Sequence, residues 1–184
     1  MQSVRVIKPT AALVPYVRHY WVLSDDALAP VSERTLPVGC VQMVFHRGRQ
    51  LFSLTEGRLQ PSSFISGQAF GYSDVESTGM LEMIVVVFQP FAAKAFLHMP
   101  VSEFRGMNVN TEEMGDPLLV DLGRRIADMP DRVACIRLIE EFLLSTVERG
   151  DLRIDGNILT EQPDILCPIL KLSAERTLCL IANE

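Results

Sequence analysis

The chain has 184 residues, of which 48% are hydrophobic and 22% are charged, and its formal net charge is -6 at pH 7. This composition is ordinary for a globular protein and excludes disorder. The length suffices for one domain, or a domain with a small helical addition, to bury a core. The acidic balance and the scattered basic residues argue against nucleic-acid binding by this segment alone.

The cysteines and the N-terminus bear on compartment and metal content. The four cysteines form no CxxC pair and have no zinc-ligand spacing to histidine, so we interpret them as buried thiols. The first residues lack the basic-then-apolar layout of a signal peptide, and no apolar run approaches the length of a membrane span. We therefore expect a cytoplasmic protein without membrane association.

The first half of the chain predicts an antiparallel sheet, because short extended runs alternate with turn residues. The predicted strands are 17–24, 41–46, 51–54, 62–66 and 81–88. In the first run, His19 and Trp21 point to one face and Tyr20 to the other. The last run is β-branched and apolar on both faces, which predicts a central strand buried from both sides.

After Pro90 the apolar period changes from two to about 3.6, which predicts helices. A short helix is expected over 92–98. A second begins at Pro117, with Asp116 as its N-cap.

A long helix is expected over 131–149, capped by Asp131. Its apolar stripe includes Ile136, Ile139 and Leu143. These side chains could pack on the sheet, or could pair with a second subunit in a homodimer.

Two weaker helical segments follow, at 163–170 and from residue 173. The last residues include Leu178, Leu180 and Ile181, with no cap or polar tail after them. This apolar end predicts that the sequence is truncated from a longer protein.

The sequence shows no signature of catalysis. Serine and glycine residues form neither a GxSxG elbow nor a phosphate-binding loop, so we predict no enzyme activity. The three histidines, His19, His46 and His98, form no HxH or HxxxH pair. His19 and His46 could face each other across neighbouring strands, but we predict neither a metal nor a cofactor.

Aromatic and polar side chains of the predicted sheet could converge on a small-molecule cavity. The alternative is that the aromatic rings fill a core and the polar groups face solvent. The candidate ligand-binding residues are Tyr20, Trp21, Arg34, His46, Gln68 and Phe88.

Four ordered segments resemble a family of regulators. They are PYVRHYWV at 15–22, LPVGCV at 36–41, SFISGQ at 63–68 and VFQPFAA at 87–93, the last continued by FLHMPVSE at 96–103. These resemble the N-terminal part of AraC-type bacterial transcription regulators over residues 10 to 150. Two positions depart from the pattern: Val38 replaces an acidic residue and Phe91 a glycine.

The resemblance implies a β-rich domain that senses a small-molecule effector or mediates dimerisation, followed by helix-turn-helix motifs that bind DNA. We therefore expect an α+β fold, with an antiparallel, cupin-like β-barrel or sandwich over 1–90, a helical segment over 91–172, and the start of a truncated DNA-binding domain over 173–184. DNA would be bound only through the missing C-terminal part. The alternatives are a stand-alone cupin-like binding protein or enzyme, and an interaction module without a ligand.

Overall fold

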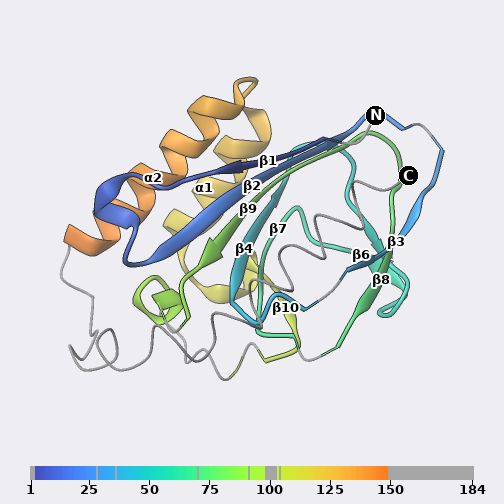
Figure 1. Ribbon diagram of the computed structural model, residues 1–184, viewed down its shortest axis with the longest axis horizontal. Coiled ribbons are helices and arrows are strands. Elements are labelled where there is room, and N and C mark those ends of the chain that lie inside the picture. The colour runs from blue at the N-terminus through green and yellow to red at the C-terminus, as the bar shows by residue number, and fades with distance from the viewer. Residues whose placement is uncertain are drawn as a thin grey trace.

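A computed structural model describes residues 3–148, apart from 28, 36, 70, 91, 98–102 and 104. In the described part, strands precede two α-helices (Figure 1). The strands are β1 (Ser3–Ile7), β2 (Val17–Asp25), β3 (Ser32–Thr35), β4 (Gln42–His46), β5 (Phe52–Ser53), β6 (Arg58–Leu59), β7 (Ser63–Ser66), β8 (Ser73–Glu76), β9 (Leu81–Phe88) and β10 (Asn108–Asn110). The helices are α1 (Pro117–Asp128) and α2 (Arg132–Glu148), with short 3-10 helices η1 (Ala11–Leu13), η2 (Ala92–Ala95) and η4 (Thr111–Met114).

The strands form two antiparallel sheets, one in the order β1-β2-β9-β4-β7-β10 and one in the order β3-β8-β5-β6. Each inner strand of the large sheet is next in sequence to one strand of the small sheet. The chain passes from the large sheet to the small one between β2 and β3 and between β4 and β5, and it returns between β6 and β7 and between β8 and β9. The order of these strands in the small sheet therefore matches the order of their partners in the large sheet. The strands β1 and β10 are added at the two edges of the large sheet.

The α+β class is confirmed by this arrangement, but the predicted barrel is not. The described strands form two open sheets, because the edge strands β1 and β10 do not pair with each other. The last strand of the six-stranded sheet, β10, lies beyond residue 90 in the sequence and pairs with β7.

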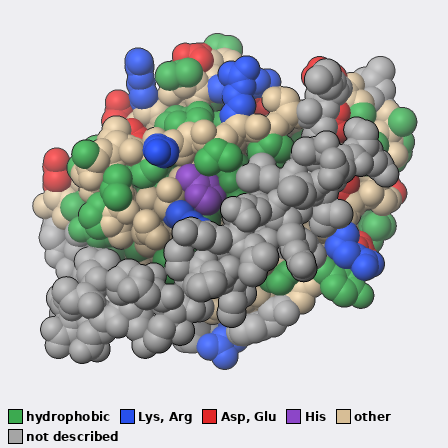
Figure 2. All heavy atoms as spheres, in the orientation of Figure 1, with side chains coloured by type: hydrophobic (Ala, Val, Ile, Leu, Met, Phe, Trp, Pro, Cys, Tyr) green, Lys and Arg blue, Asp and Glu red, His purple; other side chains and the backbone are tan. Residues whose placement is uncertain are grey.

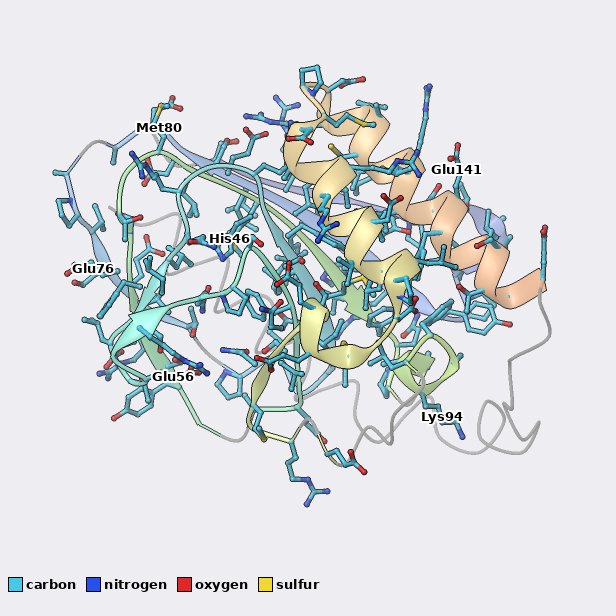
Figure 3. All side chains as sticks on the ribbon, turned by 180° about the vertical axis from the view of Figure 1, so that it is seen from behind. His46, Glu56, Glu76, Met80, Lys94 and Glu141 are labelled. Carbon is cyan, nitrogen blue, oxygen red and sulfur yellow. The ribbon has the colours of Figure 1, made fainter. Side chains whose placement is uncertain are left out.

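Both helices cover one face of the six-stranded sheet, and the four-stranded sheet turns away from them (Figures 1 and 3). Leu119, Leu122 and Ile126 of α1 and Ile139 and Leu143 of α2 are buried with the strand residues that point to this face. We call this the helix face of the sheet. Apolar burial of this extent is the main stabilising term of the fold.

The helix termini follow the capping residues of the sequence. The carboxylate of Asp116 accepts hydrogen bonds from the backbone N–H groups of Leu118 and Leu119. The carboxylate of Asp131 accepts from Val133 and Ala134 in the same way. These bonds satisfy N–H groups that have no partner within a helix, which is why both predicted starts are confirmed.

Ile136, Ile139 and Leu143, the predicted dimerisation residues, pack inside their own chain. Ile139 and Leu143 are fully buried in the core, and Ile136 is 8% exposed. These three side chains face the sheet.

The structure of the 163–170 and 173–184 segments, and of His98, lies outside the described residues. None of the described helices has the length and apolar character needed to cross a membrane.

Candidate ligand-binding site

The strands of the large sheet divide their side chains between the helix face and the opposite face, which we call the far face. Tyr20 and Phe88 point to the helix face and are fully buried in its core. Trp21 belongs to a second apolar cluster on the far face, where it is half-buried. Successive residues of a strand point to opposite faces, so neighbouring candidates in the sequence are separated by the sheet.

The far face is lined by apolar side chains from four strands and from the segment before β4. The buried members of its cluster are Cys40, Val44, Phe64, Val85 and Val87, and the half-buried members are Trp21, Leu23, Val38 and Met83. Trp21 pairs with Val85, which pairs with Val44, and Val44 pairs with Phe64. These pairings place the four side chains in one row across the sheet.

His46 lies at one end of this cluster, inside the molecule (Figure 3). Its side chain is stacked on Phe64, with ring centroids 6.0 Å apart, and His46 is 4% exposed. Burial lowers the pKa of His46 to about 4, so the ring is neutral at pH 7. Its Nε2 lies 3.1 Å from the carbonyl oxygen Oε1 of Gln60, which assigns the single ring proton to Nε2.

The other ring nitrogen of His46, Nδ1, is buried and has no hydrogen-bond partner among the residues that the structure describes. In this tautomer Nδ1 is an acceptor. A buried acceptor without a donor costs about 1–3 kcal/mol, and such groups in native proteins call for an explanation.

His19 lies at the opposite end of the far face, beside an irregularity of β2. The register of β2 against β9 shifts between Val17 and His19. His19 packs against Trp21, with ring centroids 5.1 Å apart. Its Nε2 is also buried, and no group in the described part of the chain forms a hydrogen bond with it. Burial, and then the charge of Arg18, lower the pKa of His19 to about 4. Bulges of this kind redirect side chains and are frequent next to functional sites.

Cys40 lies near the same end of the far face. Burial raises the pKa of its thiol, and the nearby Arg18 guanidinium opposes part of this effect. The thiol is therefore protonated at pH 7 and behaves as a small apolar side chain, not as a nucleophile.

The structure separates the two histidines that the sequence left as a possible pair. His19 and His46 do not face each other across neighbouring strands, because β9 lies between β2 and β4. His19 pairs with Val87 and His46 with Met83, so the two rings are also four residues apart along the sheet. These offsets correspond to a separation of roughly 16 Å, too far for a shared metal. No group of three metal-ligating side chains occurs in the part of the chain that the structure describes.

Two further candidates lie elsewhere. Arg34 on β3 is exposed, where it pairs with Asp74 and lies over the ring of Tyr72. Gln68 follows β7 and is exposed. Of the six residues predicted from sequence, only Trp21 and His46 therefore share the far face.

Sequence reasoning missed two polar contacts that hold the helices on the sheet. The first is Glu140 of α2, which is 9% exposed: its Oε1 accepts from the backbone N–H of Thr10 at 2.8 Å and from the hydroxyl of Tyr20 at 3.2 Å. Burial, and then Glu140, raise the pKa of Tyr20, so its hydroxyl remains a donor. The sequence carries one signal for this contact, which is an acidic residue beside the apolar stripe of the predicted helix.

The second contact is made by Arg47, which follows β4. Its guanidinium donates to the backbone carbonyls of Ile126, at 3.3 Å, and of Met129, both at the end of α1. It also pairs with Glu82 of β9, which Arg132 contacts from the start of α2. Arg47 therefore ties the corner between the helices to the sheet, and no motif in the sequence indicates it.

A small cavity lies between α1, β7 and η4. Its volume is about 100 Å³, and its lining includes Ser63, Thr111, Gly123 and Arg124. Cavities that hold metabolite-sized ligands measure about 300–1,000 Å³, so this one is too small for that use. Figure 2 shows the Lys and Arg side chains of the displayed side as separate spots, in keeping with the scattered basic residues of the sequence.

Comparison with known proteins gives a family but no activity. No curated protein matches the chain. The family model described as "Domain of unknown function (DUF6597)" matches residues 5–110. The match covers more than half of the chain and contains every strand from β2 to β10, including the whole far face. The chain therefore belongs to the DUF6597 family.

Proposed function

We propose that the chain is the regulatory domain of an AraC-type transcription regulator, and that the far face of its large sheet binds a small-molecule effector. One observation carries the proposal. The four sequence segments that resemble this class of regulator each supply a side chain to the far-face cluster: Trp21, Cys40, Phe64 and Val87. Segments that are far apart in the sequence thus meet on one surface.

The chemistry of the far face favours an apolar, aromatic effector. Trp21 and Phe64 offer ring surface, and both histidines are neutral at pH 7. A ligand hydroxyl or N–H group could donate to Nδ1 of His46 and satisfy the unpartnered acceptor. Arg18 supplies a positive charge only at the opposite end, near His19.

Strand β2 connects the far face to the helices. His19 and Trp21 point to the far face, and Tyr20 between them donates to Glu140 of α2. An effector that binds one position of β2 better than another would therefore shift α2, and with it any DNA-binding helices attached after it. Such coupling requires differential affinity for the two states.

The fluorescence of Trp21 tests effector binding directly, because it is the single tryptophan of the chain. Titration with a panel of small aromatic compounds is expected to quench or shift its emission for at least one of them. Met83→Gln, on the far face, should weaken that response, and Met80→Gln, at a 58% exposed position just before β9, should not. Equal effects of the two substitutions would contradict binding at the far face.

An electrophoretic shift assay on the complete gene product tests the regulatory part of the proposal. We expect a promoter fragment to be bound, with an affinity that changes when a compound selected by the fluorescence assay is added. Absence of DNA binding in both conditions would contradict a role in transcription, whatever the outcome at Trp21.

A further inference from the structure

Polar side chains form one row across the far face, at the end that carries His19. The register pairs His19 of β2 with Val87 of β9, and Val87 with Gln42 of β4. Gln42 pairs in turn with Ser66 of β7, and Ser66 with Asn108 of β10. Residues that pair directly in this way lie side by side on the same face of a sheet. We call His19, Gln42, Ser66 and Asn108 the polar row.

The fold itself uses little of the hydrogen-bonding capacity of the polar row. All four residues are half-buried. Within the described part of the chain, the side chains of Gln42 and Ser66 and the buried Nε2 of His19 form no hydrogen bond. Asn108 donates to Oε1 of Glu56 at 3.3 Å. The row therefore presents donors and acceptors to a molecule that lies on the far face.

Arg18 adds a positive charge at this end of the far face. After burial, its charge is the second cause that lowers the pKa of His19, and it opposes the effect of burial on the thiol of Cys40. Both neighbours are neutral at pH 7. Among the described residues no carboxylate pairs with Arg18, whereas Arg34 and Arg47 each pair with an acidic side chain. A half-buried guanidinium of this kind is suited to a carboxylate, which it binds through two parallel hydrogen bonds.

The far face changes from polar to apolar along its strands and ends at His46. Trp21 and Phe64 lie in the next row, two residues from the polar row, and His46 lies two residues further along. His46 is 4% exposed and lies inside the molecule (Figure 3). At about 3.4 Å per residue, the polar row and His46 are about 14 Å apart along the strands. One hydrogen bond of about 3 Å at each end leaves about 8 Å between the terminal oxygens of a ligand, which suits one aromatic ring with a short arm.

We propose that the effector of the far face is an aromatic carboxylic acid that carries a hydroxyl group at the opposite end of its ring. Its carboxylate accepts hydrogen bonds from Arg18 and the polar row, and its ring lies on Trp21 and Phe64. Its hydroxyl donates to Nδ1 of His46, which the fold leaves without a donor among the described residues. The inference rests on the proposed function and adds the chemical class and the orientation of the effector.

A set of matched compounds tests both ends of the site by isothermal titration calorimetry on the whole chain. We expect 4-hydroxycinnamate to bind with a Kd of about 100 µM or tighter. Its methyl ester lacks the charge and should bind about tenfold more weakly, as should 4-methoxycinnamate, which cannot donate to His46. Added salt should weaken binding of the acid but not of the ester. The shorter 4-hydroxybenzoate reaches only one end and should also bind about tenfold more weakly.

Two substitutions assign the ends of the ligand to the chain. Arg18→Gln should weaken binding of the acid about tenfold and leave binding of the ester unchanged. The control is Arg5→Gln, which makes the same change of charge at an exposed position of β1. His46→Phe should abolish the preference for hydroxyl over methoxy, but should retain the preference for acid over ester. Circular dichroism and the melting temperature verify that each variant is folded.

The outcomes separate this inference from the proposed function. If acid and ester bind equally well and Arg18→Gln weakens neither, the carboxylate assignment is wrong, and an aromatic effector on the far face remains supported. Binding of neutral aromatic compounds without binding of 4-hydroxycinnamate would likewise overturn this inference alone. If no aromatic compound binds, charged or neutral, both the inference and the proposed effector site are wrong.

Discussion

The two faces of the large sheet are built by the same strands and yet differ in what covers them. On the helix face, Tyr20, Ile84, Val86 and Phe88 are fully buried under two helices. On the far face, Trp21, Leu23 and Met83 remain half-buried, and two imidazoles each have a buried nitrogen that no described residue hydrogen-bonds. Dense packing maximises stability, and a surface left partly unsatisfied is where a ligand can bind. The helix face therefore contributes most of the stability, and the far face is where we propose that a ligand binds.

The largest expected difference between the faces comes from a matched pair of leucines. Leu143→Ala, on the helix face, should lower the free energy of unfolding by about 3 kcal/mol, because a fully enclosed site leaves a cavity. Leu23→Ala, on the far face, should lower it by only about 1 kcal/mol. Urea unfolding followed by circular dichroism measures both. Equal losses would show that the far face is packed as firmly as the helix face.

Arg47 provides the second test, at the corner between the helices. Arg47→Met removes the donor to Ile126 and Met129 and leaves Glu82 with Arg132 alone, which should cost about 2–3 kcal/mol of unfolding free energy. The control is Arg124→Met, whose side chain is 73% exposed, and which should change stability by less than about 0.5 kcal/mol. A small effect of Arg47→Met would mean that apolar packing alone positions the helices.

His46 predicts a pH dependence on the far face. Its pKa is about 4 in the folded chain and near 6.5 when unfolded, so the unfolded chain binds more protons between these values. Protonation of His46 therefore has little effect on the stability of the fold above pH 6.5, and it destabilises the fold as the pH falls from 6.5 toward 4. From pH 7.5 to 5 the loss is about 2 kcal/mol.

The variant His46→Phe isolates this contribution, because it retains a ring against Phe64 but cannot titrate. Urea midpoints measured at several pH values should fall less steeply for the variant than for the unmodified chain. If the urea midpoints of the two proteins fell equally with pH, His46 would be protonated as readily in the folded chain as in the unfolded chain. That result would contradict a buried acceptor at Nδ1.

The smallest expected effect concerns the contact between β2 and α2. Tyr20→Phe keeps the buried ring but removes the donor to Glu140, which should cost about 1 kcal/mol. Amide hydrogen exchange should increase around residue 140 of α2, with Tyr16→Phe as the control. Unchanged exchange in α2 would contradict the proposed path from the far face to the helices, even if the far face binds an effector.

The sequence predicted those elements whose signals are local. The runs at 17–24, 41–46 and 81–88 correspond to β2, β4 and β9, and Asp116 and Asp131 cap α1 and α2 as expected. Alternation of apolar residues and capping chemistry depend on neighbours in the chain. The strand β3 was missed because all four of its residues are exposed, so it carries no apolar alternation.

The candidate site was predicted in part for the same reason. Trp21 and His46 were identified by residue type, but Tyr20 and Phe88 were grouped with them although they point through the sheet to the helices. The register shift between Val17 and His19 also changes which face the start of β2 presents. One residue of shift reverses the face, and nothing in the local sequence reports it.

The sequence by itself determined the α+β class, the central buried strand and the starts of both helices, because each depends on residues within one turn or one strand. Only the tertiary structure decided that β9 separates His19 from His46, that α2 buries its apolar stripe, and that Glu140 and Arg47 join helices to sheet. These features depend on which strands become neighbours. Pairing between distant segments follows from the packing of the whole chain, which no single segment encodes.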